Sequence, residues 1–72
     1  MTNDKREPLV DDLLEGAAAI SEFIFGTPAR RRRVYQLAEG EENKLPTFRM
    51  GSTICSRKSS VIAWMEKLEG AA

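Results

Sequence analysis

Three consecutive residues, Gly26-Thr27-Pro28, place the strongest constraint on how this chain can fold. Glycine is the usual residue just after a helix, where the backbone turns left-handed. Threonine is a good N-cap, and proline suits the first helical position because its missing N–H is not needed there. The triplet therefore predicts that one helix stops at Gly26 and another begins at Pro28.

Apolar residues on both sides of this triplet recur at helical spacing. The first predicted helix runs from Glu15 or Gly16 to Phe25, and its inward face consists of Ala17, Ile20, Phe23 and Ile24. The second runs from Pro28 to about Glu39, ends at Gly40, and turns Val34, Leu37 and Ala38 inward. Two helices joined by so short a connection are the outline of a helix-turn-helix.

The flanking segments are less regular. Residues 1–8 are polar, carry charges of both signs and end in proline, so they are expected to form a disordered arm. The next apolar residues are interrupted by acidic ones, and form either a short helical turn or a lead-in segment packed on the core: Leu9, Val10, Leu13 and Leu14.

A β-hairpin and a further helix are expected after the charged loop 41–44. Residues 46–50 and 53–56 read as short strands around Gly51-Ser52, which suits a type II′ turn. Direct pairing puts Phe48 opposite Cys55 and Arg49 opposite Ile54, whereas one bulge would reverse the faces. Ser59 or Ser60 then caps a helix that reaches about Glu69, with Val61, Trp64, Met65 and Leu68 as its inward stripe.

Size and composition exclude several classes of protein. The chain has 72 residues, no His and one Cys, so a disulfide framework and a Cys/His zinc site are both impossible, and no cofactor is expected. A chain this short buries only about 60% of its unfolded surface and has little room for an enclosed active site, so we expect no enzyme.

Residues 1–7 lack the apolar core of a signal peptide, and no segment approaches the roughly 20 apolar residues of a membrane span, which favours a cytoplasmic protein. Cys55 is expected to be a small buried hydrophobe, and Asp11, Asp12, Glu41 and Glu42 to be solvated at helix ends and loops.

The charges are distributed unevenly along the chain. Residues 1–27 carry two basic and six acidic side chains, residues 28–58 eight basic and three acidic, and residues 59–72 one basic and two acidic. The net charge of zero therefore conceals a basic central segment. Such asymmetry in one small domain favours a localised surface for a polyanion.

The run Arg30–Arg33 is the strongest functional signal. Four cations in the first turns of a helix oppose the macrodipole and repel one another, and a bound anion would relieve both effects. The face opposite the inward stripe consists of Arg32, Tyr35, Gln36 and Glu39. Arg31 and Arg33 lie on the two flanks of this exposed face. Arginine pairs with guanine edges and glutamine with adenine edges, so Arg32 and Gln36 are candidates for base readout, together with the flanking Arg33, which also suits a phosphate.

The other candidate contacts are to the DNA backbone: Arg30, Arg31, Tyr35, Arg49, Ser52, Arg57 and Lys58. Each has an alternative interpretation. The arginine run is also compatible with a solvated helix face, Tyr35 with packing beside the helix pair, and Lys58 with protection of a strand edge. Trp64 is expected in the core because of its helical spacing with Val61 and Leu68.

Together these residues resemble the excisionase/AlpA-type small DNA-binding proteins, a branch of the MerR-like winged helix-turn-helix group. The resemblance covers about residues 13–69 and rests on the alanine-rich helix Glu15 to Gly26, the stretch Arg33-Val34-Tyr35-Gln36-Leu37-Ala38-Glu39-Gly40, the stretch Leu45-Pro46-Thr47-Phe48-Arg49-Met50-Gly51, and Arg57-Lys58-Ser59 with Ala63-Trp64. It implies a second helix in the major groove and a hairpin, or wing, on the backbone or minor groove. Two segments depart from the pattern of this family. The turn Thr27–Arg31 is longer than the usual family turn, and the loop 40–44 is longer and more acidic than usual, so this loop is a candidate contact with another protein.

The sequence thus predicts a mainly α chain with a small β-hairpin, a winged helix-turn-helix spanning residues 9–72. The expected function is sequence-specific binding of double-stranded DNA in the nucleoid of a bacterium, or for a phage or mobile element, as an excisionase (recombination directionality factor) or transcription regulator. One recognition helix reads few base pairs, so self-association or cooperative binding is expected, and an integrase is a possible protein partner. The alternatives are a protein-binding adaptor on the same scaffold and the DNA-recognition domain of a small terminase in phage packaging.

Overall fold

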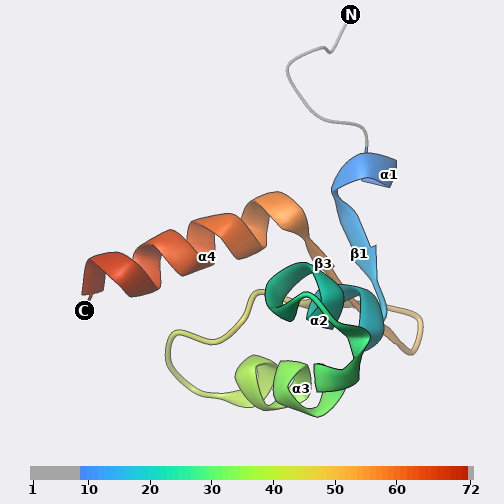
Figure 1. Cartoon of the computed structure of the whole chain (residues 1–72), viewed down its shortest axis with the longest axis horizontal. Helices are drawn as coiled ribbons and strands as arrows, with labels where there is room; N and C mark the ends of the chain where they lie inside the picture. Colours follow the sequence, from blue (N-terminus) through green and yellow to red (C-terminus); the bar gives the residue numbers. More distant parts are fainter. Residues whose placement is uncertain (1–8, 72) are drawn as a thin grey trace, which may run out of the picture.

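The computed structural model describes residues 9–71, so the arm predicted for residues 1–8 lies outside the described part (Figure 1). The elements follow the order α1 (Leu9–Asp12), β1 (Leu13–Glu15), α2 (Ala17–Phe25), the 3₁₀ helix η1 (Pro28–Arg30), α3 (Arg31–Glu39), β2 (Phe48–Met50), β3 (Thr53–Arg57) and α4 (Lys58–Ala71). The three strands form one antiparallel sheet in the order β1-β3-β2. The described chain is therefore mainly helical with a small antiparallel sheet, as expected.

The Gly26-Thr27-Pro28 triplet ends one helix and starts the next. Gly26 is left-handed, with φ of 81° and ψ of 5°, and its N–H donates to the carbonyl of Glu22 at 2.9 Å. The Thr27 hydroxyl accepts from the N–H of Ala29 at 3.2 Å, which makes Thr27 the predicted N-cap. The first turn after it is 3₁₀ rather than α, so the α-helix proper begins at Arg31.

A buried serine fixes the connection between α2 and α3. Ser21 is fully buried; its hydroxyl donates to the carbonyl of Thr27 at 2.5 Å and accepts from the N–H of Arg30 at 3.1 Å. Both backbone groups belong to the turn, and in this part-buried setting the serine hydroxyl is their hydrogen-bond partner. One side chain in α2 therefore holds the start of the arginine-bearing segment in place.

The sheet contains one strand that was not expected. Leu13–Glu15 is strand β1 and pairs with β3, with Leu14 opposite Ser56. Strand β2 pairs with β3 directly, and Phe48 faces Cys55 without a bulge, as the direct pairing predicts. Gly51 has φ of 66° and Ser52 is not among the residues with positive φ, which fits the type II′ turn.

The core lies where α2, α3, α4 and the sheet meet. Its buried members are Leu14, Ala17, Ile20, Val34, Leu45, Ile54, Val61 and Trp64. Trp64 is buried as predicted and donates its Nε1–H to the carbonyl of Asn43 at 2.8 Å, and Cys55 is fully buried. The loop between α3 and β2 is also held by the N–H of Leu45, which donates to the carbonyl of Leu37 at 3.0 Å.

Two residues predicted to face inward are on the surface instead. Phe23 and Met65 each have 37% of their surface exposed. In α2 the buried direction is set by Ala17, Ile20 and Ser21, and Phe23 points well away from it at about 100° per residue. In α4 Met65 lies at the edge of the stripe formed by the buried Val61 and Trp64.

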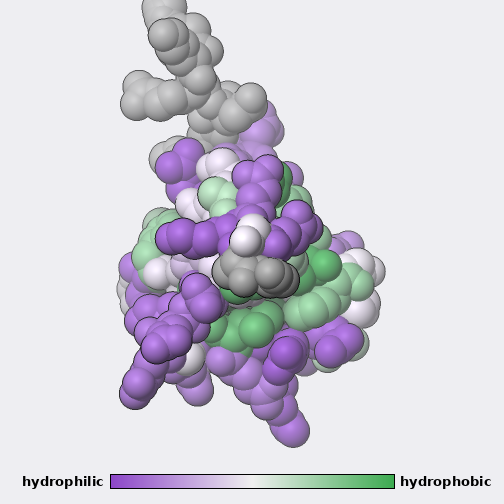
Figure 2. Space-filling model, turned by 90° about the vertical axis from the view of Figure 1, so that its left-hand side faces the viewer, coloured by the Kyte–Doolittle hydropathy of each residue, from purple (hydrophilic) through white to green (hydrophobic). Residues whose placement is uncertain are grey.

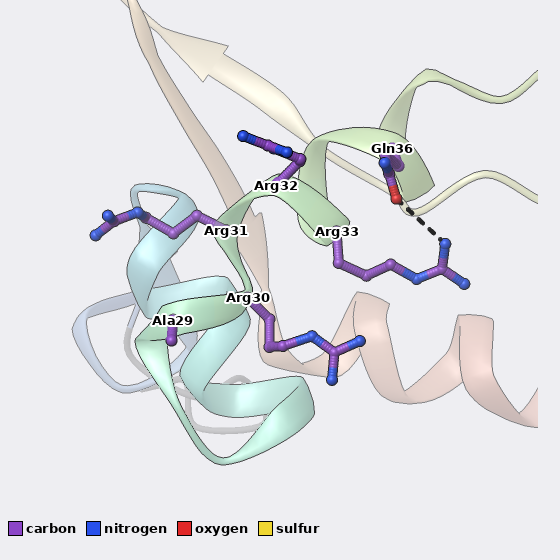
Figure 3. Close-up of a pocket in the computed structure, with 6 residues that line it drawn as sticks. All are labelled: Ala29, Arg30, Arg31, Arg32, Arg33 and Gln36. Atoms are coloured by element: carbon purple, nitrogen blue, oxygen red, sulfur yellow. Dashed lines mark hydrogen bonds between the residues drawn. The ribbon is translucent and has the colours of Figure 1, made fainter.

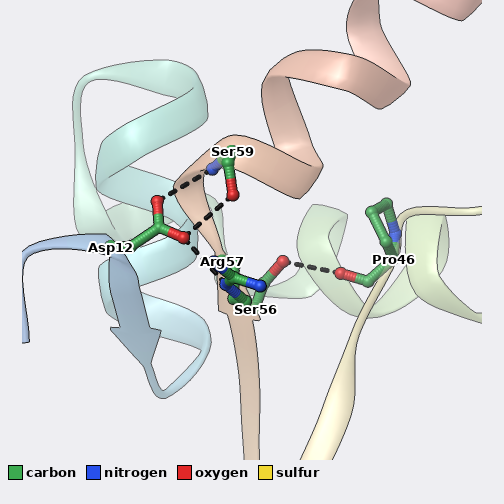
Figure 4. A network of polar contacts seen from close by, with 5 residues as sticks. All are labelled: Asp12, Pro46, Ser56, Arg57 and Ser59. Atoms are coloured by element: carbon green, nitrogen blue, oxygen red, sulfur yellow. Dashed lines mark hydrogen bonds and ion pairs between the residues drawn. The ribbon is translucent and has the colours of Figure 1, made fainter. Parts of the chain in front are cut away.

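Helix α4 begins at Lys58, so Ser59 and Ser60 are not its N-cap, contrary to the prediction. The carboxylate of Asp12 has that role from a distant part of the chain (Figure 4). It accepts from the backbone N–H of Ser59 at 3.0 Å, from the Ser59 hydroxyl at 2.9 Å and from Nε of Arg57 at 2.8 Å. Asp12 is therefore a buried side chain at a helix start, not the solvated carboxylate that was expected.

Opposing effects act on the ionisation of Asp12. Burial favours the neutral acid and alone would raise the pKa, but the hydrogen bonds from Ser59 and the charge of Arg57 outweigh burial and lower the pKa of Asp12 below its ordinary value. The carboxylate is consequently the form that the folded chain stabilises.

No helix within residues 9–71 combines the length and the apolar character needed to cross a membrane.

Candidate nucleic-acid interface

The arginine run lies on the surface at the start of α3. All four arginines, Arg30 to Arg33, are exposed, and with Ala29 and Gln36 they line one open hollow of about 570 Å³ (Figure 3). The hollow is formed almost entirely by cationic side chains. Its position at a helix N-terminus adds the positive end of the helix dipole.

Two of the arginines have contacts that orient them. The guanidinium of Arg30 stacks on the ring of Phe25, 4.7 Å from its centroid. Nη1 of Arg33 donates to Oε1 of Gln36 at 3.3 Å, so these two side chains extend together. Figure 3 shows Arg30 and Arg33 directed to one side of the helix start and Arg31 and Arg32 directed to the other.

None of these four arginines pairs with a carboxylate of the described residues. Within residues 9–71 the ion pair within 4.0 Å is that between Arg57 and Asp12. The repulsion among the four guanidinium groups and their conflict with the helix dipole are therefore not relieved inside this part of the fold. An anion with several charges would relieve both effects at once.

The exposed face of α3 agrees with the predicted helical arrangement. Val34 is fully buried and Leu37 and Ala38 are half-buried, so the inward stripe is confirmed. The residues predicted for the opposite face are all exposed: Arg32, Tyr35, Gln36 and Glu39. The phenol of Tyr35 thus lies on the same exposed face as Arg32 and Gln36, with 39% of the residue exposed.

A further cation lies on the hairpin. Arg49 in β2 is exposed, and its Nη1 donates to the carbonyl of Ser52 at 3.1 Å, which holds the guanidinium against the turn. The β2–β3 turn and the N-terminal end of α3 are both on the right-hand side of the molecule in Figure 1. Ser52 itself is exposed at the turn.

Arg57 and Lys58 have contacts inside the fold. Arg57 forms the ion pair with Asp12, although 44% of its side chain remains exposed. Nζ of Lys58 lies 5.9 Å from the ring centroid of Phe23. Both residues take part in joining β3 and α4 to the N-terminal part of the described chain, and the structure does not bring them into the hollow with the four arginines of α3.

Hydrophilic side chains cover much of the face seen in Figure 2, and apolar residues form a smaller patch among them. The face shown is thus predominantly polar around its exposed apolar residues.

Two supporting residues were missed at the level of sequence. Ser21 positions the turn that leads to the arginines, and the only signal was a hydroxyl in an otherwise apolar helical stretch. Asp12 caps α4, and its hydrogen-bond partners are 45 and 47 residues away in sequence, so no local pattern reveals the pairing.

Comparison with protein-family models, with curated proteins and with solved structures found no significant match.

Proposed function

We propose that this chain is a sequence-specific protein for double-stranded DNA with a winged helix-turn-helix arrangement. In this arrangement α2 and α3 are the helix pair, α3 enters the major groove, and the β2–β3 hairpin is the wing on the backbone or minor groove. The proposed role is that of an excisionase or a transcription regulator in a bacterium, phage or mobile element, without catalysis.

One observation carries the proposal: four exposed arginines and Gln36 share one open surface at the N-terminal end of a helix. Their guanidinium groups have no carboxylate partner among residues 9–71. DNA supplies both a row of phosphates for the cations and base edges that match arginine and glutamine.

The size of α3 suits contact by its first two turns. An α-helix is about 10–12 Å in diameter with its side chains, which fits the width of about 12 Å of the major groove, and the nine residues of α3 extend for about 13 Å. Arg32 and Gln36 are one helical turn apart on the exposed face, whereas Glu39 at the end of that face would be repelled by phosphates. We therefore assign base readout to Arg32 and Gln36, and phosphate contact to Arg30, Arg31 and Arg33.

Arg49 provides the corresponding contact from the wing. Its guanidinium is held at the β2–β3 turn by the carbonyl of Ser52, so the charge is placed at the tip of the hairpin without a large loss of side-chain freedom on binding. Arg57 and Lys58 are left out of this contact set because neither lines the hollow with the four arginines, and Arg57 is also ion-paired with Asp12.

The test is fluorescence anisotropy of a labelled random-sequence duplex at several salt concentrations. A log-log slope of affinity against salt of about −3 to −6 would mean about four to six neutralised phosphates and would support the proposal. Absence of binding near about 50 mM salt, where phosphate contacts are strongest, would contradict it.

A double variant, Arg31→Ala with Arg33→Ala, locates the contact surface. Each lost phosphate contact reduces the slope by about 1, so this variant is expected to lower it by about 2. Lys67→Ala removes an exposed cation from α4 and serves as the matched control, whose slope should remain that of the wild type.

The exposed apolar residues of β2 favour a second candidate, a protein-binding adaptor. Phe48 and Met50 have 43% and 45% of their surface exposed and lie on the hairpin beside Arg49. An acidic protein with an apolar contact would match this combination of charge and hydrophobic surface. Copurification with a defined protein, together with failure to bind duplex DNA, would favour this function over the first.

A further inference from the structure

Helix α4 carries an exposed stripe that the proposed DNA contacts do not use. The helix extends along the long axis of the view in Figure 1, and its C-terminal end lies beyond the sheet and the other helices of the described chain. The inward side of α4 is formed by Val61 and Trp64. A second side, about a quarter turn away around the helix, presents apolar residues to solvent.

The stripe consists of four residues at spacings of four, three and four: the half-buried Lys58 and the exposed Ile62, Met65 and Glu69. At about 100° per residue they fall within about 60° of one another around the helix. Ile62 is 50% exposed and Met65 is 37% exposed, although both are large and apolar. Spacings of four and three are those with which one helix presents a continuous seam to another.

The order of residues along the stripe is self-complementary. A two-fold axis between residues 63 and 64 would bring Ile62 of one α4 opposite Met65 of a second α4 that runs antiparallel to it. The same axis brings Lys58 opposite Glu69 at both ends of the stripe, so each apolar contact is flanked by an ion pair. In a two-fold interface the same patch serves both copies, and this patch meets that requirement in both hydrophobicity and charge.

We propose that a second copy of this chain covers the stripe, and that the two α4 helices pack antiparallel around that two-fold axis. Phe23, which is exposed beside Lys58, extends the apolar area at each end of the seam. Because α4 ends beyond the sheet and the other helices of the described chain, its C-terminal half is accessible to a partner.

The dimer should be weak in the absence of DNA. A seam formed by one helix of 14 residues is smaller than the roughly 800 Å² per partner of a standard stable interface. We expect a dissociation constant in the micromolar to millimolar range, so that a shared DNA molecule promotes pairing by raising the local concentration.

Sedimentation equilibrium of the full chain, without DNA, tests the pairing. Lys58→Glu and Glu69→Lys each place like charges opposite one another at both ends of the seam, and each should weaken self-association by about tenfold. The double variant Lys58→Glu with Glu69→Lys restores opposite charges and should restore association. An equimolar mixture of the two single variants should form heterodimers, because every facing pair is then of opposite charge.

Two further variants locate the interface on this side of α4. Ile62→Asp puts a charge at the centre of the seam and should abolish association, and circular dichroism verifies its fold. Lys67→Glu changes charge on the other side of α4, by the groove that it lines with Lys44, Pro46 and Trp64, and should leave association unchanged. A wild-type chain that stays monomeric up to about 1 mM, or charge reversals that act identically alone and in the mixture, would overturn the proposal.

This inference is independent of DNA binding, because all its measurements are made without DNA. A chain that dimerises through α4 but fails to bind duplex DNA would retain the interface and refute only the proposed function.

Discussion

Asp12 joins the N-terminal part of the described chain to the start of α4. Its carboxylate accepts hydrogen bonds from Ser59 and from Arg57 at the start of α4. A side-chain acceptor at the N-terminus of a helix satisfies N–H groups that have no intrahelical partner, and its negative charge is stabilised by the helix dipole.

Asp12→Asn should therefore lower the thermal stability of the chain at neutral pH. The amide retains one acceptor oxygen but loses the charge that Arg57 pairs with, and its NH₂ group faces donors. A decrease in Tm of about 5 °C or more is expected by circular dichroism. Asp11→Asn changes an exposed neighbour and should leave Tm within about 2 °C of the wild type. Equal decreases in the two variants would contradict the capping role.

The stability difference between wild type and Asp12→Asn should depend on pH. The pKa of Asp12 is lower in the folded chain than its ordinary value of 3.8, so its contribution is complete above that value and is lost as the pH falls through the lowered pKa. The Tm difference between the two proteins should therefore be largest above about pH 5 and shrink below about pH 4. A difference that stays constant down to about pH 2 would show that the charge of Asp12 does not contribute.

Arg32 and Gln36 should determine which DNA sequence is preferred. Arg32→Ala and Gln36→Ala each remove a proposed contact to a base edge, and the loss of one such contact costs about 1–3 kcal/mol of discrimination. Selection from a random duplex library should show relaxed preference at one position for each variant. Arg31→Ala should instead weaken binding to all sequences alike. An unchanged site preference in both Arg32→Ala and Gln36→Ala would refute the assigned readout.

At the level of single residues, local patterns predicted exposure and burial along the regular helices. Val34 and Trp64 are buried, and Arg32 and Gln36 are exposed, because a helical period of about 3.6 residues assigns their faces once the helix is located. Phe23 and Asp12 were misplaced for different reasons. The inward direction of α2 is shifted by the buried Ser21, and the partners of Asp12 come from the other end of the chain.

Among the elements, the connection between α2 and α3 depends on one hydroxyl. Ser21→Ala would leave the carbonyl of Thr27 and the N–H of Arg30 without their present partner. A fully buried unsatisfied group costs about 1–3 kcal/mol, and because these two groups are only part-buried we expect their combined loss to lower the unfolding free energy from urea titration by about 1–3 kcal/mol. Ser52→Ala at the exposed hairpin turn is the matched control and should change it by less than about 0.5 kcal/mol. An unchanged unfolding free energy in Ser21→Ala would contradict this role, because water or a small shift of the turn would then satisfy the carbonyl of Thr27 and the N–H of Arg30.

Helices whose ends are marked by local residue preferences could be predicted from the sequence, whereas contacts between residues distant in sequence could not. Gly26, Thr27 and Pro28 determine a helix end and a helix start by their own conformational preferences. The β2–β3 hairpin is similarly local, since Gly51 suits its turn. Strand β1 has only three residues and exists because β3 offers it a pairing edge, and α4 starts at Lys58 because Asp12 reaches it.

For the whole molecule, the uneven charge along the chain becomes a local basic surface. The arginines of α3 lie together around one hollow, and Arg49 lies on the β2–β3 hairpin. The sequence indicated this surface because a run of four arginines in a helix necessarily places several of them on exposed faces. It did not indicate the stripe on α4, because Met65 was assigned to the core.

The most direct test of the proposed DNA surface is NMR titration of the isotope-labelled chain with a duplex. We predict that the largest amide shifts fall on residues 30–36 and on the turn at Gly51 and Ser52, and that they diminish as salt is raised. Shifts confined to other surfaces, such as the loop 41–44 or the exposed stripe of α4, or no shifts at about 50 mM salt, would contradict this prediction.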